Sequence, residues 1–157
     1  MKIRQAKLKD EKEFLKTQKE AFPNLDLKKQ SKYFKEKIKN KEIFIAEENG
    51  KYAGHHSFGK YMLNPPFATG VSGEELAVKN NFRGKGIGTA LINSIINYCK
   101  KRKIRVFYIP TGDFKGNKAI KFYKKLGFEK VGVLKDINPE SEYDYGQIIM
   151  AKVIDNQ

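Results

Sequence analysis

The sequence has few of the residues that form covalent or metal cross-links. Its 157 residues include one cysteine, two histidines and no tryptophan. The single Cys99 excludes a disulfide within the chain, and the adjacent His55 and His56 have no cysteine partners for a structural zinc site. Long apolar runs are also absent, so no membrane span is expected, and the charged start Met1-Lys2-Ile3-Arg4 contains no apolar leader. We expect one cytoplasmic, metal-free domain over residues 1–157.

Acidic residues are scarce beside basic ones. The chain has 18 Asp and Glu against 32 Lys and Arg, which gives a formal net charge of +14. Only four of the basic residues are arginines, and the lysines are spread along the whole sequence. Nucleic-acid readers rely on arginine and concentrate their charge on one face, so a solvated lysine surface is favoured over nucleic-acid binding. The positive field still attracts an acidic ligand such as a nucleotide phosphate.

The spacing of apolar residues predicts alternating helices and strands without an internal repeat. Asp10 followed by Glu13 is expected to cap the first helix. The order β-αα-βββ-α-β-α-ββ predicts an α/β domain with one parallel crossover near its middle. Strands are expected over residues 2–6, 42–47, 52–61, 71–78, 104–109, 128–134 and 143–153, and helices over residues 10–22, 27–38 and 117–126 and around the apolar stripe of residues 91–99.

A glycine-rich turn joins the third of the middle strands to the long helix. It consists of Arg83, Gly84, Lys85, Gly86, Ile87, Gly88 and Thr89. Glycines at such a turn let main-chain N–H groups converge beside the positive end of a helix dipole, which favours a phosphate. The alternative is that they only allow a tight turn. The spacing does not fit the P-loop or the dinucleotide fingerprint, but it fits [Gln/Arg]-x-x-Gly-x-[Gly/Ala].

That pattern, after the strand Leu76-Ala77-Val78, resembles the acetyl-CoA-binding motif of the GNAT superfamily of N-acetyltransferases. The resemblance extends over residues 3–153. It implies a mixed, mostly antiparallel sheet with splayed central parallel strands, flanked by helices. It also implies that Leu76, Ala77 and Val78 hold the pantetheine arm of acetyl-CoA through main-chain bonds, while residues 83–89 wrap its pyrophosphate.

A second segment, Gly116 to Phe128, is similar to the cofactor-side helix of the same family. There, a tyrosine hydroxyl lies by the thioester sulfur, which gives Tyr123 the role of acid to the departing thiolate. The alternative is a core aromatic with its hydroxyl at the rim. The family commonly has Asn-x-x-Ala where this chain has Asn117-x-Ala119. Asn117 is therefore expected either to cap the helix or to touch the cofactor.

Two adjacent glutamates precede the glycine turn. A carboxylate can collect the proton of the attacking amine, and successive strand residues point to opposite faces unless a bulge intervenes. The run Glu74-Glu75-Leu76-Ala77-Val78 is similar to one in family members that acetylate polyamines or amino sugars. By that similarity Glu74 is the first candidate for the base and Glu75 the second. His55 and His56 are weaker candidates, and a packed or hydrogen-bonded histidine is favoured.

These features predict direct transfer of an acetyl group from acetyl-CoA to a primary amine of a small molecule or a protein, by a monomer or homodimer. The amides around Ala77 and Val78 would polarise the thioester carbonyl. The alternatives are a non-catalytic coenzyme A sensor or a basic nucleic-acid-binding module. We expect the acceptor to contact residues 22–27, 61–69 and 135–145. An acidic pocket for it would include Glu74, Glu75, Asp136, Glu140, Glu142 and Asp144.

Overall fold

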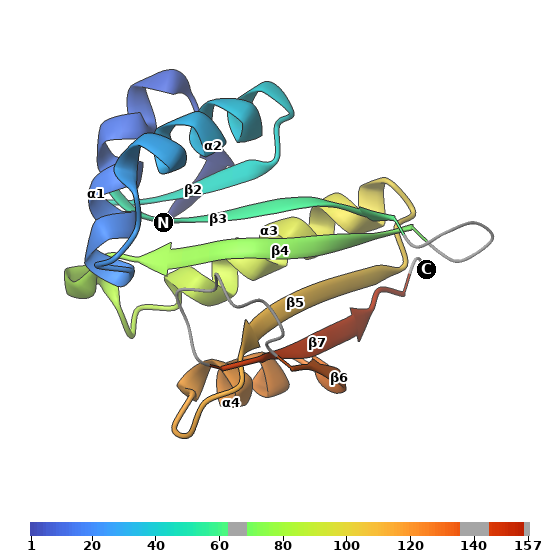
Figure 1. Ribbon diagram of the computed structural model, residues 1–157. Coiled ribbons are helices and arrows are strands. Elements are labelled where there is room, and N and C mark those ends of the chain that lie inside the picture. Colours follow the sequence, from blue (N-terminus) through green and yellow to red (C-terminus); the bar gives the residue numbers. More distant parts are fainter. Residues whose placement is uncertain (63–68, 136–144, 156–157) are drawn as a thin grey trace. The chain divides into compact units, whose positions relative to one another are not determined.

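Two compact units make up the chain in a computed structural model (Figure 1). The structure describes residues 1–62, 69–135 and 145–155. The first unit comprises Met1–Gly59 and Glu74–Tyr98, and the second comprises Lys60–Gly73 and Cys99–Gln157. The single domain expected from the chain length stays a prediction.

The strands form a seven-stranded sheet in the order β1-β2-β3-β4-β5-β7-β6. Most neighbours pair antiparallel, and β4 and β5 pair in parallel. The first six elements are β1 (Lys2–Gln5), α1 (Glu11–Ala21), α2 (Leu27–Lys39), β2 (Ile43–Glu48), β3 (Lys51–Met62) and β4 (Thr69–Val78). The remaining ones are α3 (Ile87–Lys101), β5 (Val106–Gly112), α4 (Lys118–Lys125), β6 (Glu129–Leu134) and β7 (Gln147–Val153), with short 3-10 turns at Leu8–Asp10 and Asn80–Phe82.

The alternating residues of β2 give the first unit its two apolar layers. Ile43 and Ile45 pack with Phe14 of α1 and Phe34 of α2, and the two phenylalanine ring centroids are 4.8 Å apart. The intervening Ala46 belongs to a second cluster with the buried side chains of β3, the glycine turn and α3. Both faces of these strands are covered, and β3 is buried from residue 52 to residue 59, where the polar His55, His56 and Ser57 are buried together with apolar side chains.

The second unit is built around β5 and β7. These strands pair antiparallel from Val106 opposite Val153 to Gly112 opposite Gln147. The parallel ladder joins Gly70, Val71 and Ser72, in the first half of β4, to residues 106–108 of β5. The core of the second unit includes Phe107, whose ring packs against that of Phe128 with centroids 5.3 Å apart.

The structure confirms the predicted element order and changes some of its details. Asp10 does not cap α1; its carboxylate instead accepts two hydrogen bonds of 2.7 Å from Arg4. Strand β5 continues through Pro110, which lies opposite Ile149, because a proline can sit where the ladder needs no N–H. The helix expected from residue 27 does begin there, and Leu27 at its first position is 41% exposed.

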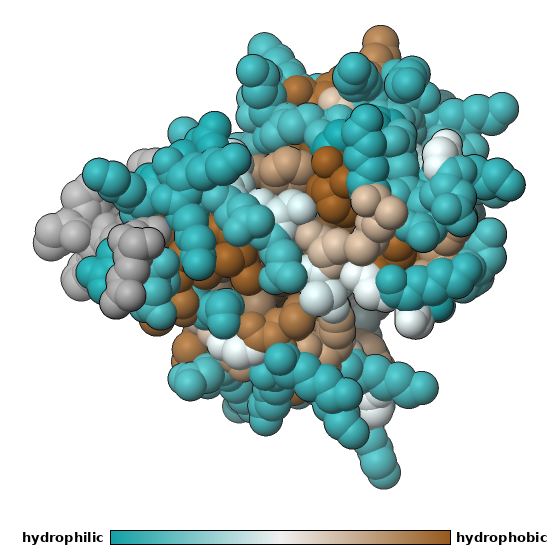
Figure 2. All heavy atoms as spheres, turned by 180° about the vertical axis from the view of Figure 1, so that it is seen from behind, coloured by the Kyte–Doolittle hydropathy of each residue, from teal (hydrophilic) through white to brown (hydrophobic). Residues whose placement is uncertain are grey.

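The outer surface is dominated by charged side chains. Figure 2 shows hydrophilic residues around much of one face of the molecule, with hydrophobic residues gathered between them. Most lysines of the described residues are exposed and lie along the whole sequence, as expected for a dispersed lysine surface. None of the helices in the described ranges is long and apolar enough to cross a bilayer.

Candidate functional site

The glycine turn leads from the end of β4 into α3. Phe82 and Ile87 are buried on either side of it and anchor it to the second apolar cluster of the first unit. Between them, Gly84 and Gly86 have φ angles of +74° and +77°, which explains why glycine is needed at both positions. A Cβ atom at either position would meet no heavy atom within 4 Å. The main chain of the turn therefore borders open space.

The local charges of this turn favour an anion. Ala90 donates to the Gly86 carbonyl at 3.0 Å, so the N–H groups of residues 87–89 lie in the first turn of α3, where a helix offers them no partner. The helix dipole adds partial positive charge there. Arg83 and Lys85 are exposed beside them, and Arg83 Nε donates to the Val78 carbonyl at 3.2 Å. The donors and cations of this turn fit a diphosphate.

The strand that leads into the turn is held closely by β3. A Cβ atom added to Gly54 would lie 2.6 Å from the Ala77 carbonyl oxygen, so only glycine allows this approach. Just beyond Val78, the main-chain N–H of Lys79 donates to the Ala53 carbonyl at 2.9 Å. Ala77 is buried, and its neighbours Leu76 and Val78 are partly buried against the second apolar cluster. The main chain of residues 76–78 is thus fixed before α3 begins.

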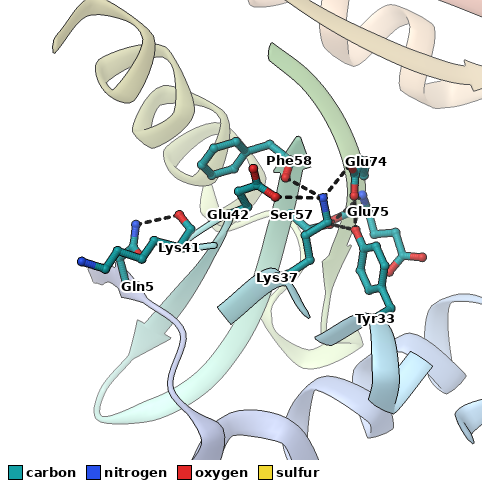
Figure 3. Close-up of polar contacts among 9 residues, drawn as sticks. All are labelled: Gln5, Tyr33, Lys37, Lys41, Glu42, Ser57, Phe58, Glu74 and Glu75. Atoms are coloured by element: carbon teal, nitrogen blue, oxygen red, sulfur yellow. Dashed lines mark hydrogen bonds and ion pairs between the residues drawn. The ribbon is translucent and has the colours of Figure 1, made fainter. Parts of the chain in front are cut away.

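Glu74 belongs to an ion-paired cluster with α2 (Figure 3). Its Oε1 lies 2.7 Å from Lys37 Nζ, and the Tyr33 hydroxyl donates to its Oε2. Lys37 Nζ also donates to the Phe58 carbonyl at 2.9 Å and lies 3.3 Å from Glu42 Oε2. The Lys37 side chain is only 9% exposed, so these oxygens replace its water. The Glu74 carboxylate is therefore already neutralised by a cation of the protein.

Glu75 has different partners. Gln18 of α1 donates to its Oε2, and Gln30 of α2 donates to its Oε1 at 3.3 Å. Burial raises the pKa of Glu75 to about 7, and nearby Glu74 acts in the same direction, while the hydrogen bond from Gln30 and the charge of Lys37 oppose this rise. Near neutral pH this carboxyl group can therefore both accept and release a proton.

Both glutamates reach side chains of α2, although a regular strand points successive residues to opposite faces. The main chain departs from a simple ladder here, because the Glu75 N–H donates to the Ser57 hydroxyl at 3.0 Å. Ser57 Oγ also lies 2.7 Å from the Tyr33 hydroxyl. The two carboxylates thus belong to one polar cluster, but a cation holds Glu74 and neutral amides hold Glu75.

The two histidines are buried side chains of β3. Burial lowers the pKa of each to about 3, so both are neutral at physiological pH. The ring of His55 packs against Phe14 with centroids 4.4 Å apart. Over residues 1–62, 69–135 and 145–155, no three His, Cys, Asp or Glu side chains form a group that could hold a metal ion.

Tyr123 and Asn117 lie in the second unit. Tyr123 of α4 is 7% exposed, its ring packs against Phe122 and Phe128, and burial raises its pKa to about 12. Asn117 caps α4, because its Oδ1 accepts from the Ala119 N–H at 2.9 Å. Its amide nitrogen donates to Thr111 Oγ1 and to the Gly112 carbonyl. These bonds establish the capping role of Asn117, and its contact with a cofactor stays a prediction.

Several members of the glutamate cluster escaped sequence reasoning. Gln18, Gln30, Tyr33 and Lys37 are not among the site residues that the sequence predicts. A signal was present, because Lys37 follows Tyr33 and Phe34 at helical spacing and therefore lies next to the apolar stripe of α2. Of the expected acceptor-contacting segments, residues 63–68 lie outside the described residues, as do Asp136, Glu140, Glu142 and Asp144.

The chain is similar to known proteins over most of its length. It is 42% identical over 107 residues to an uncharacterized N-acetyltransferase of Methanocaldococcus jannaschii, a match that covers 66% of this chain and 46% of that protein, so the chain spans less than half of that relative. It is 28% identical over 160 residues to an N-alpha-acetyltransferase of Sulfurisphaera tokodaii, with coverage of 92% and 89%.

Solved structures agree on the fold. An aminoglycoside 6'-N-acetyltransferase complexed with coenzyme A superposes with a TM-score of 0.81 at 19% identity, covering all of this chain and 99% of the other. The model of the acetyltransferase (GNAT) family matches residues 11–128, which is more than half of the sequence. The motifs, the fold and this match lead to one conclusion: the chain belongs to the GNAT family of acetyltransferases.

Proposed function

We propose that this protein transfers an acetyl group from acetyl-CoA to the α-amino group of a peptide or protein, with Glu75 as the base and Tyr123 as the acid. The observation that supports the base most directly is the environment of Glu75. Its carboxyl group is buried, is held by two amide donors, and has a pKa of about 7. Family membership and the open glycine turn support the acetyl donor.

The residues of the turn and of the preceding strand would hold the donor. The N–H groups of residues 84–89 would bind its diphosphate, with Arg83 and Lys85 adding charge attraction. The main chain of Leu76, Ala77 and Val78 would bind the pantetheine arm. When bound, acetyl-CoA supplies an activated acetyl thioester. The protein supplies proximity to the amine, which accounts for a large part of the acceleration in such transfers.

Glu75 is the better candidate for the base, although the sequence places Glu74 first. A general base works best when its pKa lies near the working pH, as that of Glu75 does. Both oxygens of Glu74, in contrast, are engaged by Lys37 and Tyr33. Glu75 would take the proton of the attacking amine directly or through water, and Glu74 would hold Lys37 and Tyr33 in place.

Tyr123 is proposed to return a proton to the thiolate that leaves. Because burial raises its pKa to about 12, the phenol is fully protonated at neutral pH and able to donate. Its ring is fixed between Phe122 and Phe128, so the hydroxyl has a defined direction. Helix α4, which presents it, is itself fixed by the Asn117 cap.

The acidity of the amine itself favours one class of acceptor. An α-ammonium group has a pKa of about 8, whereas a lysine side chain has one of about 10.4. Whatever its own pKa, a base therefore deprotonates an α-ammonium group more readily than a lysine side chain, by roughly two hundredfold. The name of the Sulfurisphaera tokodaii relative, an N-alpha-acetyltransferase, points to the same acceptor class.

A thiol-release assay over an amine panel tests the proposal. The panel contains peptides with a free α-amino group, the same peptides blocked at that group but with a free lysine, and a polyamine. We expect transfer to the free α-amino group, and a loss of at least a hundredfold in Glu75→Gln with little change in Glu36→Gln, whose side chain is exposed. Acetyl-CoA binding without transfer to any amine would contradict the proposal and favour a sensor.

A further inference from the structure

A line of buried polar side chains ends at Glu75. The Tyr52 hydroxyl lies 2.7 Å from His55 Nδ1, and His55 Nε2 lies 2.9 Å from Gln18 Oε1. The amide nitrogen of Gln18 then donates to Glu75 Oε2 and, at 3.2 Å, to Gln30 Oε1. Gln18 and His55 are completely buried. The line thus runs from β3 through α1 to the carboxylate of β4.

The chemistry of the groups sets the direction of every bond in this line. An ionised carboxylate only accepts, so Gln18 must present its amide N–H groups to Glu75 and its carbonyl oxygen to His55. A carbonyl oxygen also only accepts, so His55 must have its proton on Nε2. His55 Nδ1 is then the acceptor, and the Tyr52 hydroxyl donates to it. With Glu75 ionised, one arrangement of protons satisfies the whole line.

Filling space alone does not require such a line. Burying a polar group costs free energy unless each of its atoms is hydrogen-bonded. The surroundings are apolar, since His55 packs against Phe14 and the cluster includes Phe34 and Ile45. Apolar side chains of similar volume would fill the same space at positions 18 and 55. The line keeps its polar atoms, and all of them lead toward one carboxyl group.

We propose that Gln18, oriented by His55, is a positioning residue that holds the Glu75 carboxylate in one orientation and favours its ionised form. This inference rests on the proposed function, in which Glu75 is the base. A neutral amide cannot pass a proton along the line, so Gln18 and His55 do not act as a relay. They determine where the Glu75 oxygens lie and how readily they accept a proton.

Other groups near Glu75 also shift its pKa away from that of a free carboxyl group. Glu74, adjacent in β4, disfavours the charge, while Lys37 of α2 favours it. Tyr33 of α2 is kept protonated by burial and by Glu74. At the far end of the line, Lys79 lies over the Tyr52 ring and pairs with Glu13 of α1. None of these contacts is removed by a change at Gln18.

The test replaces Gln18 by Met, which keeps the volume and removes the hydrogen bonds. The carboxyl carbon of Glu75 is followed by NMR on protein labelled at the glutamate side-chain carboxyl, with Glu75→Gln to assign the signal. We expect the Glu75 pKa to rise by about one pH unit in Gln18→Met. The acid limb of kcat/KM should move with it, so that activity falls about tenfold at pH 6 and recovers at pH 9. A merely structural defect would not recover.

Two further variants keep the test decisive. Thr17→Val is the matched control, because Thr17 is equally buried in α1 but donates to the Glu13 carbonyl rather than to Glu75, and its profile should equal that of the wild type. If Gln18→Met does not fold, Gln30→Met removes the second donor to Glu75 and should raise the same pKa.

The outcomes separate this inference from the proposed function. An unchanged Glu75 pKa in folded Gln18→Met, or in Gln30→Met where Gln18→Met does not fold, would overturn the positioning role, as would a His55 found by NMR with its proton on Nδ1. If instead Glu75→Gln retains full activity while the NMR pKa shift occurs, the positioning role stands and Glu75 is not the base.

Discussion

Replacing Glu75 by Gln is expected to make the protein more stable at alkaline pH while removing its activity. The folded protein keeps a proton on Glu75 up to a pKa of about 7, whereas the unfolded chain releases it near the ordinary value of 4.5. Between those values the folded state binds more protons than the unfolded state. The free energy of unfolding of the wild type therefore falls as the pH rises from about 4.5 to 7.

The size of this effect follows from the same pKa. A pKa difference of one unit corresponds to about 1.36 kcal/mol. The folded and unfolded states differ in the protonation of Glu75 between pH 4.5 and about pH 7, and most of this range lies between pH 5 and pH 8. The amide introduced by Glu75→Gln does not titrate, so the advantage of this variant over the wild type should grow by roughly 2–3 kcal/mol between these two pH values. Any loss of hydrogen bonds at the new amide is the same at both and cancels in the comparison.

Urea unfolding followed by circular dichroism at pH 5 and pH 8 measures this difference. A Glu36→Gln control, at an exposed position, should show almost none of it. If the difference between wild type and Glu75→Gln is flat with pH, or shrinks toward pH 8, then the raised pKa is wrong and the choice of Glu75 as base loses its main support.

Three other substitutions test separate parts of the site. Tyr123→Phe should lower kcat by about a hundredfold with the Kd for acetyl-CoA nearly unchanged, because only the hydroxyl is lost. Gly86→Ala should weaken acetyl-CoA binding in calorimetric titration, since a side chain at a φ of +77° costs about 1–2 kcal/mol and occupies the open side of the turn. Lys37→Met should lower the free energy of unfolding at pH 7 by about 2 kcal/mol, because it leaves Glu42 and Glu74 without their cation.

Each of these has a control elsewhere in the chain. Tyr98→Phe removes a phenol from α3 and should leave turnover unchanged. Gly132→Ala places a methyl group in open space without a left-handed backbone and should bind acetyl-CoA normally. Lys35→Met removes an exposed lysine that pairs only loosely with Glu11, at 3.5 Å, and should change stability by less than about 0.5 kcal/mol. Equal effects in a variant and its control would refute the corresponding argument.

The fold could largely be predicted from local sequence. The β-rich run from Ile43 to Ala46 predicts a strand, and the structure adds that its residues belong to two separate apolar clusters. The turn around Gly84 and Gly86 was also evident, since only glycine adopts their backbone conformation readily. The role of Asp10 was not evident from the sequence. Its carboxylate bonds to Arg4 of β1 and does not cap α1, and the spacing of residues along one helix does not reveal such a competing partner.

The sequence by itself determined the family, the turn that fits a diphosphate and the presence of two adjacent carboxylates, because these depend on neighbouring residues. Only the tertiary structure decided how the carboxylates differ. The partners of Glu75 come from position 18 in α1 and position 30 in α2, and the cation at Glu74 comes from position 37. A pKa depends on burial and on partners in space, and the chain brings these together only by folding.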